Sequence, residues 1–63
     1  MKLIIKWRYP DEEQTHEHIF YDINPKKINI GYGFLYFEAM EEPQKKHWTF
    51  ALSHIIEMHM EEE

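Results

Sequence analysis

Apolar and polar residues alternate along most of this chain with a period of two. The first such run covers residues 2–9, where apolar side chains recur at every second position: Leu3, Ile5, Trp7 and Tyr9. This pattern is typical of a β-strand with one buried and one solvated face. A polar stretch over residues 11–14 follows, and it predicts the end of this first strand.

A second alternating run covers residues 18–23. Strict alternation assigns Ile19, Tyr21 and Ile23 to the buried face and Phe20 to the opposite face. We therefore expect a second strand with a large aromatic side chain on its outer side.

The middle of the chain carries turn signals between apolar segments. Asn24-Pro25 predicts a turn, because proline fixes φ near −65° and asparagine tolerates unusual backbone dihedrals. Gly31 and Gly33 interrupt the next alternation and predict a bulge or a sharp bend. Residues 34–40 are almost continuously apolar, which indicates a strand with both faces covered.

The C-terminal third allows two interpretations. Residues 47–52 and 56–61 alternate and read as two strands. A helix after Pro43 is the alternative, with an apolar stripe at helical spacing: Trp48, Leu52, Ile55, Ile56 and His59. We predict strands, because Trp, Thr and Phe are weak helix formers and glutamates near a C-terminus oppose the helix dipole.

The sequence thus predicts a single all-β domain over residues 1–63. Its five or six strands would form a small curled antiparallel sheet or an open barrel of the SH3-like or Sm-like kind. The alternative is an α+β fold, in which one C-terminal helix after Pro43 crosses an antiparallel sheet.

Composition narrows the functional class. The chain has 63 residues, no cysteine, 16% aromatic residues and a formal net charge of −5. A chain this short buries only about 60% of its unfolded surface, so we expect a homodimer to support its core. A net negative charge argues against direct nucleic-acid binding. No apolar run approaches the roughly 20 residues that span a bilayer, and we expect a cytoplasmic protein that does not contact membranes.

Few residues suit catalysis. Ser53 is the only serine, and on a strand its neighbour His54 would point to the opposite face, so the two form no nucleophile–base pair unless the turn expected at Ser53-His54 intervenes. Gly31 and Gly33 are not followed by a helix start, as a phosphate loop requires. We therefore predict that the protein is not an enzyme and uses no cofactor.

Two histidines are weak candidates for metal binding. His16 and His18 fall on the same side of one strand, a spacing that some metal sites use. The spacing does not determine a third ligand, and two solvated histidines are the interpretation that we favour.

The aromatic residues exceed what so small a core needs, which indicates a recognition surface. Alternation turns Phe20, Phe34 and Tyr36 away from the face that holds Leu35 and Phe37. Large aromatic side chains on a second face can form a second core layer, a dimer interface or a surface that contacts a partner. We predict that these three residues bind the partner, with a charged rim formed by Glu41, Glu42 and Glu57.

Two segments resemble small β-rich proteins of phages and prophages of Gram-positive bacteria. They are Gly33-Phe34-Leu35-Tyr36-Phe37-Glu38 and Trp48-Thr49-Phe50-Ala51-Leu52-Ser53-His54-Ile55 with the alternating acidic end. His54 stands where asparagine is commoner in those proteins. Members with known roles bind and block a host protein or a signalling molecule, so the resemblance implies an inhibitor.

From these observations we expect a non-enzymatic interaction protein that binds and blocks a host macromolecule. Its concrete form is a phage-encoded inhibitor of a bacterial defence or housekeeping protein, acting in the host cytoplasm. One alternative is an acidic mimic of nucleic acid. Another is a protein that sequesters a nucleotide, with rings from Tyr32, Tyr36 and Trp48 and phosphate-binding lysines Lys26, Lys27, Lys45 and Lys46.

Overall fold

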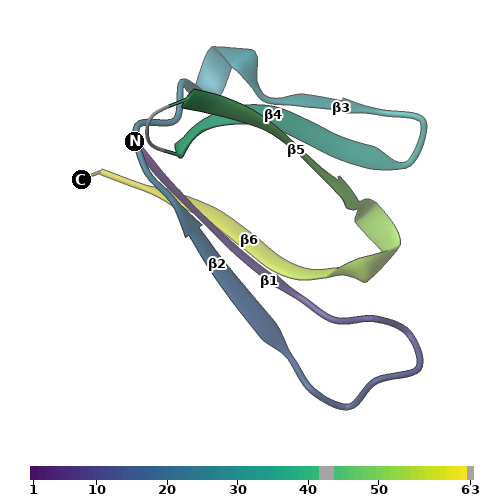
Figure 1. Ribbon diagram of the computed structural model, residues 1–63. Coiled ribbons are helices and arrows are strands. Elements are labelled where there is room, and N and C mark those ends of the chain that lie inside the picture. Colours follow the sequence, from purple (N-terminus) through teal and green to yellow (C-terminus); the bar gives the residue numbers. More distant parts are fainter. Residues whose placement is uncertain (42–43, 63) are drawn as a thin grey trace.

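The computed structural model describes residues 1–41 and 44–62, and of Glu41 only the backbone. These residues form two three-stranded antiparallel sheets that face each other (Figure 1). The first sheet has the order β2-β1-β6 and contains β1 (Lys2–Trp7), β2 (His16–Phe20) and β6 (Ile55–Glu61). The second sheet has the order β3-β4-β5 and contains β3 (Asn29–Gly31), β4 (Phe34–Glu41) and β5 (Gln44–Ala51).

The prediction of an all-β fold is confirmed. The alternative of a helix after Pro43 is wrong, because residues 44–51 and 55–61 are the strands β5 and β6. Pro43 itself lies outside the described residues. Two short 3-10 turns complete the described chain: η1 (Pro25–Lys27) lies between β2 and β3, and η2 (Leu52–His54) lies between β5 and β6. Both three-stranded sheets are open rather than closed into a barrel.

The core lies between the two sheets. It contains seven buried apolar residues from both of them: Leu3, Ile5, Phe20, Ile23, Leu35, Phe37 and Ala39. Leu3 and Ile5 confirm the alternation predicted for β1, the central strand of the first sheet. Rings of Trp7, Trp48 and Phe50 pack around this core.

The alternation predicted for residues 18–23 is wrong by one position. Phe20 is 7% exposed and belongs to the core, whereas Ile19 and Tyr21 are exposed. The cause is Asp22, whose φ of 57° is left-handed and resets the alternation. Ile23 therefore returns to the core as expected, although the strand before it has the opposite phase.

β4 also differs from the expectation of two covered faces. Its residues alternate, with Leu35, Phe37 and Ala39 buried and the residues between them exposed. Tyr32 and Gly33 form a two-residue turn between β3 and β4, with φ of 54° and 80°. Positive φ at both central positions is the geometry of a tight hairpin, and Gly33 supplies one of them without steric cost.

The connection from β2 to β3 is fixed at two points. The Ile23 N–H donates a hydrogen bond to the Met1 carbonyl oxygen over 2.8 Å. The Asn24 side-chain oxygen accepts from the Lys26 N–H over 3.0 Å and caps η1, while Pro25 occupies the first turn. These contacts hold η1 in a defined place beside the second sheet.

Candidate functional site

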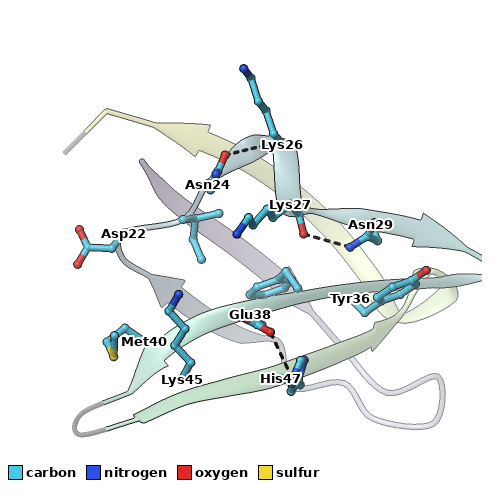
Figure 2. Close-up of a pocket in the computed structure, with 12 residues that line it drawn as sticks. Asp22, Asn24, Lys26, Lys27, Asn29, Tyr36, Glu38, Met40, Lys45 and His47 are labelled. Atoms are coloured by element: carbon cyan, nitrogen blue, oxygen red, sulfur yellow. Dashed lines mark hydrogen bonds and ion pairs between the residues drawn. The ribbon is translucent and has the colours of Figure 1, made fainter.

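A pocket of about 640 Å³ lies between η1 and the second sheet (Figure 2). We call it the η1 pocket. It forms where β3 is too short to accompany β4 along its length. Asn29 pairs with Tyr36, and β4 continues to Glu41 without β3 beside it. The β2–β3 connection lies beside the part of β4 that β3 does not reach. Side chains from that connection and from β4 therefore line the pocket.

Two ammonium groups point into the η1 pocket from opposite sides. Lys27 reaches in from η1 and Lys45 from β5, and their side chains are directed toward each other (Figure 2). Within residues 1–40 and 44–62, neither ammonium group has an acidic partner within ion-pair distance. Lys26 also lies at the rim, but its ammonium group points away from the pocket (Figure 2).

The acidic groups near the η1 pocket are directed elsewhere. The Glu38 carboxylate lies 3.4 Å from His47 Nε2, across the β4–β5 pair. Asp22 turns its carboxylate away from the pocket (Figure 2). Both carboxylates nevertheless belong to the lining, which therefore carries three lysines against two acidic residues, a small local excess of positive charge in an otherwise acidic protein.

One end of the η1 pocket carries an aromatic ring and a carboxamide. Tyr36 and Asn29 face each other across the β3–β4 pair (Figure 2). The Asn29 Nδ2 donates to the Lys27 carbonyl oxygen over 3.1 Å. Asn24, which caps η1, lies on the other side of Lys27, toward the ammonium groups. Local hydrogen bonds thus orient both carboxamides.

The residues predicted to bind a partner do not form one surface. Phe20 lies in the core, which corrects the expectation that it faces outward. Phe34 and Tyr36 are exposed on β4, as expected. Glu57 lies on the first sheet, opposite Lys6 of β1, and is therefore remote from that face. Of the remaining rim residues, Glu42 lies outside the described residues, and Glu41 is placed only as the last residue of β4.

The two histidines proposed as weak metal candidates face the space between the sheets. His18 Nδ1 accepts a hydrogen bond from Trp7 Nε1 over 3.1 Å, and His16 stacks on the Trp7 ring with centroids 4.4 Å apart. His16 Nε2 also lies 3.2 Å from a Glu12 carboxylate oxygen. Across the described residues, no three His, Asp or Glu side chains are grouped in a way that could hold a metal ion.

The lysines considered for nucleotide binding divide in the structure. Lys26, Lys27 and Lys45 line the η1 pocket, while Lys46 is not among its lining residues. Of the candidate rings, Tyr36 lines the pocket. Tyr32 projects from the hairpin turn and is fully exposed, and Trp48 packs against the core.

The sequence interpretation missed the two asparagines of the η1 pocket. Asn24 carried a signal, since Asn before Pro at a predicted turn is a frequent cap of a helical turn. Asn29 carried none, because its role depends on where η1 lies in the folded chain.

The outer face of the first sheet has a different electrostatic arrangement. Lys2 Nζ lies 3.3 Å from Glu61 Oε2, and His59 Nε2 lies 3.1 Å from Glu61 Oε1. The hydrogen bond from Lys2, followed by that from His59, lowers the pKa of Glu61. The charges on this face therefore satisfy one another.

The comparisons with known proteins supply no relative. No family model, curated protein or solved structure matches this chain. Among the described residues, no helix is long and apolar enough to cross a bilayer.

Proposed function

We propose that this protein is a binding protein that takes up a small anionic ligand in the η1 pocket. The observation that carries the proposal is the pair of ammonium groups of Lys27 and Lys45, which point into one pocket and have no acidic partner among the side chains that the structure describes. This proposal corresponds to the alternative, named in the sequence analysis, of a protein that sequesters a nucleotide. It places the ligand beside the second sheet of a single chain, whereas that alternative placed it at a dimer interface.

The electrostatics of the η1 pocket favour an anion. Like charges directed toward each other raise the energy of the free protein, and an anion between them removes that repulsion and forms charge-assisted hydrogen bonds. Lysine acts on phosphate groups as a point charge, so no bidentate geometry is needed. Because the chain has a formal net charge of −5, its overall field does not attract anions. An anion site therefore depends on the lysines that line it.

The size of the η1 pocket supports a ligand larger than a simple ion. Its volume of about 640 Å³ lies within the range of roughly 300–1,000 Å³ that is typical of small-molecule sites. Ile23, Phe37 and Met40 add apolar surface to the charged and polar lining. The lining thus combines orienting polar groups with apolar walls, as ligand sites do.

The pocket supports binding more than chemistry. Its closest acid–base pair is Glu38 with His47, and these side chains are 47% and 82% exposed. Water screens a pair this exposed, so it lacks the desolvation that adapts catalytic groups to their task. We therefore interpret Glu38 and His47 as a surface ion pair of the second sheet and not as catalytic groups.

The test is titration of the full chain with inorganic pyrophosphate, followed by isothermal calorimetry and backbone amide shifts. We expect binding that weakens with added salt, with shifts concentrated in residues 22–29 and 36–47. Lys27→Gln and Lys45→Gln should each reduce affinity by about tenfold, the equivalent of one charge-assisted hydrogen bond.

The matched control is Lys26→Gln, which removes the same charge from the same turn. Because the Lys26 ammonium group points away from the pocket, its loss should reduce affinity much less than the loss of Lys27. Equal losses for the two variants would show that pyrophosphate responds only to total charge and would contradict the proposal.

A second candidate function is binding of a bacterial host protein, which the resemblance to phage inhibitors implies. The observation in its favour is the hairpin between β3 and β4, where Tyr32 and Phe34 are both exposed. A contact of this kind suits a basic partner, since the chain has a net charge of −5.

The two candidates respond to different substitutions. Phe34→Ser should release a host protein captured with the tagged chain and leave pyrophosphate binding intact. Lys27→Gln should do the reverse. Capture that persists in Phe34→Ser would argue against the hairpin as the contact surface.

A further inference from the structure

We propose that the ligand of the η1 pocket is a nucleotide, with its phosphate between Lys27 and Lys45 and its base against Tyr36. This inference rests on the proposed function and specifies its ligand class. It follows from the division of the pocket into a cationic part and a part that carries the Tyr36 ring and the Asn29 carboxamide.

The two carboxamides each have one end engaged and one end open. Asn24 Oδ1 accepts from the Lys26 N–H, which leaves its Nδ2 donor open. Asn29 Nδ2 donates to the Lys27 carbonyl oxygen, which leaves its Oδ1 acceptor open. Among the described residues, neither open end has another partner. Because the engaged ends fix the orientation, the pocket presents one defined donor and one defined acceptor.

The open acceptor of Asn29 matches part of the edge of a nucleobase. Adenine presents an exocyclic amine that can donate to a carboxamide oxygen, and asparagine is a residue that recognises adenine. A simple phosphate or a sugar phosphate has no amine of this kind. The Asn29 carboxamide beside Tyr36 therefore favours a nucleotide over other anions of similar charge.

Tyr36 supplies a surface for the base. Its side chain is 43% exposed and lies beside Asn29 at the end of the pocket (Figure 2). An aromatic face that is partly open to solvent can stack with any of the bases, because every base has a π-face. Such stacking makes a large contribution to affinity. Base stacking and base-edge recognition would thus occur at the same end, with the phosphate toward the lysines.

The experiment compares adenosine 5′-monophosphate with ribose 5-phosphate, using calorimetry on the full chain. Both probes carry the same phosphate ester and sugar, and they differ only in the base. We expect adenosine 5′-monophosphate to bind at least about tenfold more tightly than ribose 5-phosphate, which is the contribution of one stacked base. Tyr36→Leu should abolish most of this difference, because leucine removes the aromatic face on which the base would stack.

Asn29→Ala tests the recognition of the base edge. Alanine removes the Oδ1 acceptor without adding charge. We expect the affinity for adenosine 5′-monophosphate to fall more than the affinity for ribose 5-phosphate.

The outcomes separate this inference from the proposed function. Equal affinity for both probes in the unmodified protein overturns the nucleotide inference and leaves the anion site in place. A difference between the probes that survives Tyr36→Leu overturns the placement of the base. Failure of both probes and of pyrophosphate to bind overturns the anion site itself, and the nucleotide inference with it.

Discussion

The two sheets share one core but differ in how their outer faces use charge. On the first sheet, Lys2 lies opposite Glu61, and Lys6 lies opposite both Glu17 and Glu57. On the second sheet, Lys45 lies opposite Met40, so its charge has no counterpart across the strand pair. Cross-strand register, rather than the number of lysines, therefore determines which cations are available to a ligand.

This difference also explains why an acidic chain can carry an anion site. Opposite charges that face each other across strands stabilise the sheet modestly and cancel locally. An unpaired lysine contributes nothing of that kind to the sheet and retains its charge for binding. The first sheet is accordingly a structural element, and the second carries the η1 pocket.

The largest expected effect concerns what the two sheets have in common. Leu3 of the first sheet and Leu35 of the second are both 0% exposed. We expect Leu3→Ala and Leu35→Ala each to lower the free energy of unfolding by about 2–5 kcal/mol. This is a large part of the roughly 3–9 kcal/mol expected for a chain of this length.

Urea unfolding followed by far-UV circular dichroism and by tryptophan fluorescence measures this effect. Ile30→Ala, at an exposed position of the β3 edge, is the control and should cost much less. If Leu35→Ala produced a separate early transition while the remaining signal unfolded as in the unmodified chain, the two sheets would not share one core.

The next prediction concerns a substitution that gives the outer face of the second sheet the same charge pairing as the first. Met40→Glu places a carboxylate opposite Lys45, as Glu61 lies opposite Lys2. Pyrophosphate affinity should fall by about tenfold or more, since the new carboxylate competes with the ligand for the ammonium group. Met40→Gln has a similar length without the charge and should retain binding. Calorimetry with pyrophosphate measures the affinities of the two variants. Equal affinities would contradict the prediction.

A smaller effect separates the two tryptophans, one from each sheet. Trp7 Nε1 donates to His18 Nδ1 over 3.1 Å, whereas Trp48 Nε1 is buried and has no acceptor among the described residues. Trp7→Phe should therefore cost about 1 kcal/mol more in unfolding free energy than Trp48→Phe, because only the first substitution removes a hydrogen bond. Thermal unfolding of both variants measures the difference, and a larger cost for Trp48→Phe would reverse the argument.

The smallest effect tests the charge pairing on the first sheet. The pKa of Glu61 is lowered by the hydrogen bond from Lys2 and then by His59. A carboxyl group whose pKa is lower in the folded state adds stability above its unfolded pKa, and this contribution is lost as pH falls through the folded pKa. Glu61→Gln should thus lower the melting temperature slightly at pH 7, and the difference should vanish in strong acid. A difference that grows as the pH falls would contradict the pairing.

Sequence alone predicted the fold where local alternation continues without interruption. β1 and β5 follow their apolar pattern, because each strand has one core-facing side. β6 follows it only at Met60. At its start Ile55 packs against the core and Ile56 is exposed, because the register with β1 shifts between Lys6 and Trp7. The phase of β2 was not predictable, since it depends on the left-handed backbone of Asp22, and aspartate takes that conformation only in some contexts.

The candidate site was predictable only in part. Lys27, Lys45 and Tyr36 were considered together from their residue types, and the structure brings them to one pocket. The carboxamides of Asn24 and Asn29 were not considered, because their open ends depend on hydrogen bonds within η1. The pocket itself results from the short length of β3, and no alternation pattern reveals where a strand pairing ends.

The left-handed backbone at Asp22 has a consequence for which sequences can encode this fold. Position 22 is exposed, and exposed positions usually accept many residue types. Its dihedral angle instead restricts it to glycine, asparagine, aspartate and few others, with β-branched residues the least acceptable. Sequence variation at this surface position is thus constrained by the backbone, although no packed core surrounds the side chain.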